Sequence, residues 1–301
     1  MTSRERVLAT FSREPVDRVP RWCGASLEFR KKAKAELKLD DEGLRAHVGD
    51  DFRRVFAPYV HPGELPEGMT YATPFGIGRA GIGCGQAVNH PLAGASLEDI
   101  ETYSWPDPTH VDVSTLREQA RAWDQQYAVL GGDWSPFWHD AIDLVGMERL
   151  YLLMYDAPDM VDALLERVVD FYAESSRRIF DEAAGEIDIF FIGNDFGSQT
   201  GPLMSVELFE RFLLPHLRRL IRLGHDYGLP VQLHCCGGIE PLMPALIDAG
   251  LDALHALQPD CHGMDPASLK RSYGDRLVLN GGIDSHHVLI DGESPDFVRR
   301  K

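Results

Sequence analysis

The hydrophobic pattern in the second half of the chain alternates between two kinds of segment. Short apolar runs are followed by longer stretches in which apolar residues recur at helical spacing. We expect strands at Tyr127–Gly131, Ile187–Ile192, Val231–Cys235, Ala253–Leu257 and Leu277–Asn280, and helices at about Ala141–Tyr155, Asp159–Ala184, Val206–Tyr227, Ile239–Ala249 and Asp265–Tyr273. Strands that alternate with helices over short connections predict an α/β protein with a parallel sheet.

The first half of the chain has a less regular pattern. We expect a helix over Arg6–Phe11, a first strand over Arg18–Cys23 and a further helix over residues 28–47. Residues 58–95 are rich in Gly and Pro and are expected to form loops and short strands. We interpret the whole chain, residues 1–301, as a single domain. The Gly-x-Gly-x-x-Gly fingerprint of a dinucleotide site is absent, so the pattern favours a closed barrel over a doubly wound sheet.

Charge and cysteine content narrow the class of protein. The formal net charge of −17 argues against nucleic-acid binding, because phosphate contacts need clustered Lys and Arg. Of the five cysteines, Cys235 and Cys236 are adjacent, which is a poor arrangement for disulfides and indicates a reducing, cytoplasmic compartment. The N-terminus is polar, unlike a signal peptide, and no apolar run approaches the roughly 18 residues of a membrane span.

The strand end His234-Cys235-Cys236-Gly237 carries the strongest chemical signal. Alternate residues of a strand face the same side, so His234 and Cys236 should point one way and Cys235 the other. In a barrel this end of the strand lies at the mouth, where active sites form. An imidazole beside a thiolate suits Zn²⁺; a core thiol with a hydrogen-bonded His and a Cys–His nucleophile pair are the alternatives. Cys261, just beyond the next strand, is either a third metal ligand or an inert small residue.

Polar residues also follow the strand predicted at Ile187–Ile192. Asn194, Asp195 and Gln199 lie in the loop after it, where side chains can hold a substrate or a metal. Turn formation and helix capping are the alternative roles for such residues. We assign a catalytic role to Asp195 and substrate contacts to Asn194 and Gln199.

Two more loops supply candidates. The glycines of Asn280-Gly-Gly-Ile-Asp284 permit close approach to a ligand, so we assign Asn280 to substrate binding and Asp284 to catalysis, with helix capping as the alternative for Asp284. Trp134 and His139 bound an aromatic loop that either covers an apolar or cofactor-bearing substrate or packs without a function. We assign Trp134 to substrate binding and His139 to catalysis.

Over nearly its whole length the chain resembles the uroporphyrinogen decarboxylase superfamily. Three stretches carry the resemblance: Arg4-Glu-Arg-Val-Leu with Pro15-Val-Asp-Arg-Val-Pro20, Asp195 to Pro215 with Met204-Ser205 and Leu214-Pro215-His216, and Tyr273-Gly-Asp-Arg-Leu-Val-Leu-Asn-Gly-Gly-Ile-Asp284. The resemblance implies a (β/α)8 barrel of the TIM type and a homodimer, which is common in the superfamily. The chain ends inside the helix expected after Asp284, so we expect a C-terminal truncation that removes the last strand and its ligand.

The motifs are closer to one branch of the superfamily than to the other. True decarboxylases carry Met-Arg-Gln-Ala-Gly-Arg after the first strand, and these arginines bind porphyrinogen carboxylates; Trp22-Cys-Gly-Ala-Ser-Leu-Glu-Phe29 stands there in this chain. The other branch holds methyltransferases that pass a methyl group between a corrinoid protein and a thiol or pterin. Their zinc is held by His-x-Cys at a late strand and by a further Cys, and His234 and Cys236 are similar to that motif. The zinc lowers the pKa of an incoming thiol.

Three functions are therefore open. The first is a zinc-dependent methyltransferase that moves a methyl group between a corrinoid protein or methylated small molecule and a thiol or pterin. The second is a decarboxylase-like lyase that acts without metal on an organic acid or tetrapyrrole, with carboxylate binding near Asp195, His139 and Arg21. The third is a barrel without enzymatic activity that binds a corrinoid or tetrapyrrole or serves as a partner protein.

Overall fold

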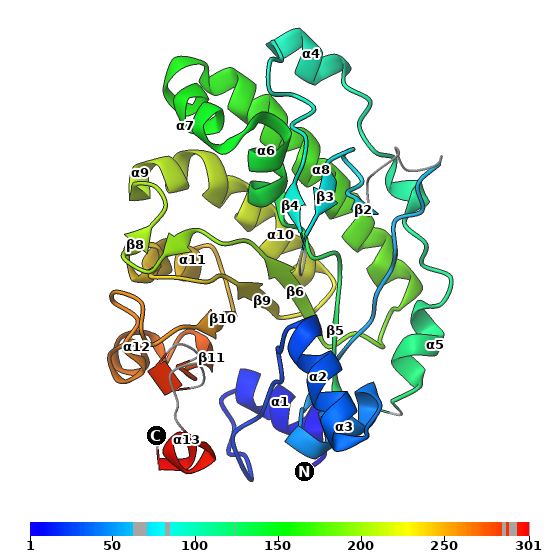
Figure 1. The fold of residues 1–301 in the computed structure, drawn as a ribbon, viewed down its shortest axis with the longest axis vertical. Helices are drawn as coiled ribbons and strands as arrows, with labels where there is room; N and C mark the ends of the chain where they lie inside the picture. The colour runs from blue at the N-terminus through cyan, green and yellow to red at the C-terminus, as the bar shows by residue number, and fades with distance from the viewer. Residues whose placement is uncertain (63–70, 82–84, 124, 285–286, 289–293, 301) are drawn as a thin grey trace.

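A computed structural model describes residues 1–62, 71–81, 85–123, 125–284, 287–288 and 294–300. A parallel sheet runs through the molecule (Figure 1), with the strands ordered β1-β5-β6-β9-β10-β11. The strands are β1 (Phe52–Arg54), β5 (Ala128–Gly131), β6 (Ile189–Gly193), β9 (Val231–His234), β10 (Ala253–Leu257) and β11 (Val278–Gly281).

The order of these strands identifies the fold class. Every neighbouring pair is parallel, and the spatial order follows the chain order without a reversal. A doubly wound sheet would reverse at a switch point, whereas a barrel adds each strand beside the last. The predicted α/β architecture of the TIM-barrel type is confirmed. In the described part of the chain it forms an open half-barrel of six strands, in which β1 and β11 are the edges.

Helices connect and cover the strands. They are α1 (Ser3–Phe11), α2 (Leu27–Leu37), α3 (Asp41–Val48), α4 (Leu97–Thr102), α5 (Leu116–Arg121), α6 (Phe137–Val145), α7 (Met147–Asp156), α8 (Pro158–Glu182), α9 (Val206–Leu208), α10 (Leu214–Asp226), α11 (Met243–Asp248), α12 (Pro266–Tyr273) and α13 (Pro295–Arg300). The longest, α8, packs against α4, α6, α7 and α10. Among the described residues, no helix is both long enough and apolar enough to cross a membrane.

Smaller elements lie outside the main sheet. β2 (Tyr71–Ala72), β3 (Gly78–Ala80) and β4 (Gln86–Ala87) form an antiparallel sheet inside the predicted loop region, and β7 (Gly197–Ser198) pairs with β8 (Gly201–Pro202). Short 3-10 turns are η1 (Pro108–His110) and η3 (Glu240–Leu242), and η2 (Phe209–Leu213) is a π-helical turn.

The two faces of the sheet bury different side chains. Val129 and Phe190 belong to the large core between sheet and helices, whereas Leu130 and Phe191 belong to a smaller core inside the half-barrel. Side chains alternate along a strand, so His234 at the end of β9 faces the interior because its neighbours on either side, Leu233 and Cys235, lie in the helix-side core.

The predicted first strand, Arg18–Cys23, is wrong. A strand ladder does not form there: the Asp51 carboxylate accepts the Arg21 backbone N–H at 2.7 Å and the Arg18 guanidinium at 2.7 Å, and the Asp51 N–H donates to the Arg21 carbonyl at 2.8 Å. Pro20 also lacks the N–H that a ladder needs. The first strand of the sheet is instead β1, which contributes too short an apolar run to be detected.

Two predicted helices are each divided in the structure. Residues 28–47 form α2 and α3, because Lys38 adopts a left-handed conformation (φ 55°) and Asp40 caps a new helix. The helix predicted at Ala141–Tyr155 is divided into α6 and α7 at Gly146 (φ 90°), a conformation that favours glycine.

Candidate metal centre

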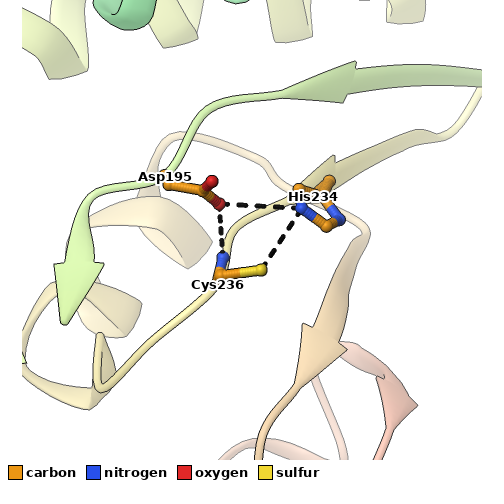
Figure 2. A group of neighbouring side chains, drawn as sticks. All are labelled: Asp195, His234 and Cys236. Atoms are coloured by element: carbon orange, nitrogen blue, oxygen red, sulfur yellow. Dashed lines mark hydrogen bonds and ion pairs between the residues drawn. The ribbon is translucent and has the colours of Figure 1, made fainter. Parts of the chain in front are cut away.

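Three side chains from two neighbouring strand ends converge at the mouth of the half-barrel. Figure 2 shows Asp195 after β6 turned towards His234 and Cys236 at the end of β9. The Cys236 Sγ lies 3.4 Å from His234 Nε2, which lies 3.6 Å from Asp195 Oδ1. One oxygen, one nitrogen and one sulfur therefore lie within 4.8 Å of one another. We call these residues the Asp-His-Cys group; in the described part of the chain, no other three His, Cys, Asp or Glu side chains meet this spacing.

Glycine brings the two loops together. Gly237 adopts φ 91°, and a Cβ there would lie 2.4 Å from the backbone carbonyl carbon of Gly197. A side chain at either position would separate the loop after β6 from the loop after β9. The close approach allows the Cys236 backbone N–H to donate to Asp195 Oδ1 at 2.7 Å. The geometry of the Asp-His-Cys group thus depends on Gly197 and Gly237 as well as on its own three residues.

Asp195 is ionised in this environment. Burial by itself would raise its pKa, but hydrogen bonds from His139 and from the Cys236 N–H lower the pKa of Asp195 to about 2. His139 Nε2, on α6, lies 3.5 Å from Asp195 Oδ2. The Nδ1 of His139 is buried and has no hydrogen-bond partner among the described residues, so the imidazole proton is best placed on Nε2, facing Asp195.

Cys236 is a poor nucleophile in the absence of a cation. Burial and the neighbouring charge of Asp195 raise the pKa of the Cys236 thiol to about 12. A Cys–His nucleophile needs the opposite environment, one that stabilises the thiolate. A bound divalent cation would reverse this balance, because it favours the thiolate and neutralises the carboxylate together. The electrostatics therefore favour a metal centre over a thiol nucleophile.

His255 supports His234 from the next strand and was not selected from the sequence. It lies opposite His234 in the β9–β10 register, and the two Nδ1 atoms are 2.8 Å apart. Trp22 stacks on the other face of the His255 ring at 4.1 Å. Burial lowers the pKa of His255 to about 3 and also lowers the pKa of His234, so both imidazoles are neutral. The sequence did contain one indication of this role, because His255 is a polar residue inside the otherwise apolar strand β10.

The donor set fits zinc. Zinc takes thiolate sulfur, imidazole nitrogen and carboxylate oxygen, and catalytic sites commonly use three protein ligands with one open position. Bonds of about 2.0–2.3 Å at tetrahedral angles separate neighbouring ligand atoms by about 3.4–3.6 Å. The separations of 3.4 and 3.6 Å around His234 Nε2 lie in that range.

Cys261, predicted as the third ligand, does not join the Asp-His-Cys group. Its buried thiol donates to Gln258 Oε1 at 3.6 Å, and the same oxygen accepts the Gly237 N–H at 2.9 Å. Gln258 therefore fixes the turn after Cys236. In this structure Asp195, predicted as catalytic, supplies the third donor atom.

Of the two substrate-binding residues predicted nearest to the Asp-His-Cys group, Trp134 and Asn194, one lies beside the group and the other is buried away from it. Trp134 lies beside the Asp-His-Cys group, with its ring centroid 5.3 Å from that of His234. Asn194 is fully buried: its amide donates to the Ser135 carbonyl and its oxygen accepts the Trp138 N–H, both at 2.9 Å. Asn194 therefore positions the loop after β6 and does not face the mouth.

Gln199, Asn280, Asp284 and Arg21 lie outside the Asp-His-Cys group. Gln199 is exposed at the turn between β7 and β8, and Arg21 is also exposed. Asn280 in β11 lies opposite His255 in the strand register, so it borders the supporting residues. The Asp284 carboxylate accepts the backbone N–H of His287 at 2.7 Å. This bond agrees with the alternative role of Asp284, helix capping.

The chain is similar to proteins of one enzyme family. The family model described as uroporphyrinogen decarboxylase (URO-D) matches residues 82–301. The methylcobamide:CoM methyltransferase MtbA of Methanosarcina mazei is 21% identical to the chain, and the match covers 98% of this chain and 86% of the relative. The uroporphyrinogen decarboxylase of Alkalilimnicola ehrlichii is 26% identical, over 99% of this chain and 82% of the relative.

A solved structure has the same fold. The chain superposes on a methyltransferase from Methanosarcina mazei with a TM-score of 0.65 and 22% identity, covering 97% of this chain and 86% of that one. The shared architecture is therefore that of the uroporphyrinogen decarboxylase family fold.

Proposed function

We propose that this chain, which belongs to the uroporphyrinogen decarboxylase family, is a zinc-dependent methyltransferase. The observation that carries the proposal is the convergence of Asp195, His234 and Cys236 donor atoms within 4.8 Å at adjacent strand ends. The similarity to a methylcobamide:CoM methyltransferase over nearly the whole chain supports it. The methyl group would pass between a corrinoid protein, or a methylated small molecule, and a thiol or pterin acceptor.

Asp195, His234 and Cys236 would hold the metal. A zinc ion in this position would supply Lewis acidity, which lowers the pKa of a bound thiol and keeps it as the nucleophilic thiolate. The Cys236 thiol must lose its proton to become a ligand. His139, whose Nε2 lies 3.5 Å from Asp195 Oδ2, would orient that carboxylate towards the metal.

His255 and Trp22 would hold His234 ready for the metal. The His234 Nε2 lone pair faces the other two donors when the proton of its neutral ring lies on Nδ1. That proton then donates to His255 Nδ1 at 2.8 Å, and Trp22 fixes the plane of the His255 ring. Such outer hydrogen bonds orient ligands and raise their basicity. Trp134 and Phe191 screen this side of the group from water.

A decarboxylase-like lyase that acts without metal is the second candidate. It is supported by the match to a uroporphyrinogen decarboxylase over 99% of the chain. The absence of arginines from residues 22–29 speaks against porphyrinogen carboxylates as its ligand. Release of labelled CO2 from a candidate acid by chelator-treated protein would support this reaction over methyl transfer.

Metal analysis of Cys236→Ser tests the proposal. The parent chain, purified without chelator, should contain about one zinc per chain, and Cys236→Ser should retain less than about a tenth of that. Cys235→Ala is the matched control, because Cys235 is adjacent but faces the helix-side core, where its Sγ accepts the Phe196 N–H at 3.3 Å. The control should keep its zinc and lose about 1 kcal/mol of unfolding free energy.

Two results would contradict the proposal. A parent protein that remains free of metal when zinc is supplied would remove its basis. Equal zinc content in Cys236→Ser and Cys235→Ala would place the metal elsewhere. Transfer of a methyl group from methylcobalamin to a small thiol, lost in Cys236→Ser alone, is the expected activity.

A further inference from the structure

A cavity of about 180 Å³ lies inside the half-barrel. Its walls include the side chains of Trp22, Phe52 and Phe191, so it is apolar over much of its lining. Pockets of this kind usually select a ligand through a few polar groups set into an apolar wall. Arg54, the last residue of β1, is such a group.

Arg54 differs from the other arginines that line the cavity. Each of the others has a carboxylate partner: Arg30 with Asp41, Arg45 with Asp50, and Arg53 with Glu42. Within the described ranges, Arg54 forms no ion pair and no hydrogen bond. Its guanidinium carbon lies over two aromatic rings instead, 5.0 Å from the Trp134 centroid and 5.4 Å from that of Phe191.

Among the described residues, no carboxylate lies within ion-pair distance of the Arg54 guanidinium. Asp133 attracts it from farther away, although burial raises the pKa of Asp133 to about 6 and its carboxylate accepts the Ser135 N–H at 3.1 Å. Burial lowers the pKa of Arg54 below its usual value, although a guanidinium stays protonated. The Arg54 side chain is partly buried, and none of its nitrogens is both buried and without a partner, so the guanidinium is accessible to a ligand that enters the cavity.

The position of Arg54 links it to the metal centre. The Trp134 ring contacts both the Arg54 guanidinium, at 5.0 Å, and the His234 ring, at 5.3 Å. Phe191 likewise contacts Arg54 and, at 5.7 Å, His255. One aromatic side chain, Trp134, therefore contacts both the Arg54 guanidinium and a residue that would hold the metal.

We propose that Arg54 is the anion-binding residue of the substrate pocket and takes the carboxylate of a small planar organic acid. The guanidinium fork matches a carboxylate bidentately, and the aromatic walls suit a flat body. The placement of the reacting end of that acid at the metal rests on the proposed methyltransferase function, whereas the carboxylate subsite does not.

Benzoate, benzamide and benzamidine are suitable probes, because they are close in shape and carry negative, zero and positive charge. We expect calorimetric titration of the full chain, freed of metal by chelator, to give at least about tenfold tighter binding for benzoate than for benzamide. Benzamidine should not bind. Propionate serves as a smaller carboxylate in the same titration. Since no metal is present, a failure of zinc binding would leave this result unaffected.

Arg54→Met removes the charge and keeps much of the length. It should weaken benzoate binding by about tenfold or more, to the level of benzamide. Arg54→Lys should recover part of the affinity, because it restores the charge without the fork. Arg30→Met is the matched control: its cation lines the same cavity but already pairs with Asp41, so benzoate affinity should change less than about twofold.

Thermal unfolding separates a binding role from a structural one. If the role of Arg54 is to bind a ligand, ligand-free Arg54→Met should unfold at the same temperature as the parent or at a higher one. Benzoate should then raise the unfolding temperature of the parent but not that of Arg54→Met. The proposal is overturned if neither carboxylate binds, if benzoate and benzamide bind equally, or if Arg54→Met binds benzoate as the parent does. A lower unfolding temperature for ligand-free Arg54→Met would likewise assign Arg54 to structure.

Discussion

Asp195 and Asp140 are two carboxylates close to His139, and the structure shifts their pKa values in opposite directions. Asp195 contacts His139 in space, and its side chain is 36% exposed; Asp140 follows His139 in α6 and is 2% exposed. Backbone and imidazole donors lower the pKa of Asp195 to about 2. Burial raises the pKa of Asp140 to about 7, against a hydrogen bond from Tyr172 and the Arg79 charge 4.0 Å away.

This difference explains why Asp195 is suited to bind a cation and Asp140 is not. Asp195 is ionised before any ligand arrives, and it faces a second negative group, the potential thiolate of Cys236, across a short gap. Asp140 holds a proton near neutral pH and is enclosed by the large core. The extent of burial and the number of oriented donors together decide which carboxylate can bind metal.

Exchanging the Asp195 carboxylate for an amide should have the largest effect. Asp195→Asn keeps the shape but removes the charge, so we expect zinc affinity to fall by about 100-fold or more in a chelator competition. Cys261→Ala is the control, and it should bind zinc as the parent does, because its thiol contacts Gln258 and is not part of the Asp-His-Cys group. The reverse ranking would show that the sequence-based choice of Cys261 was right.

Asp140→Asn should change stability and leave zinc binding intact. The pKa of Asp140 is higher in the folded chain than in the unfolded chain, so the folded state retains its proton longer. Stability from this group is complete below about pH 4 and is lost as pH rises to about 7, at a cost of about 4 kcal/mol. Urea unfolding at pH 4 and pH 8 should therefore show a smaller decline for Asp140→Asn than for the parent. Equal declines would mean that Asp140 is ionised throughout.

The smallest expected effect concerns His255. His255→Phe keeps a ring for Trp22 to stack on but removes the partner of His234 Nδ1, so zinc affinity should fall by about tenfold. His255→Asn places an amide near the lost nitrogen and should recover part of the affinity. If both variants bind zinc equally well, His255 has a packing role alone.

Local patterns predicted a large part of the architecture. The later strands and their carboxyl ends followed from short apolar runs between amphipathic helices, and strand alternation placed His234 and Cys236 on one side and Cys235 on the other. The prediction of the first strand was wrong. The Arg21 backbone N–H donates to the Asp51 carboxylate, which lies 30 residues away in the sequence, and a local pattern of apolar residues cannot indicate such a bond.

Only the tertiary structure decided the composition of the site. Asp195 becomes a donor because Gly237 and Gly197 allow two loops to touch, and His255 supports His234 because of the register between β9 and β10. Among the described arginines that line the cavity, Arg54 is the one without an ion pair, and this can be known only from the carboxylate partners of the other three. Residue type and spacing fix which atoms can bind a metal or an anion, because these depend on side-chain chemistry and strand period. Which of those atoms meet, and which charge is left unpaired, depends on contacts between distant segments.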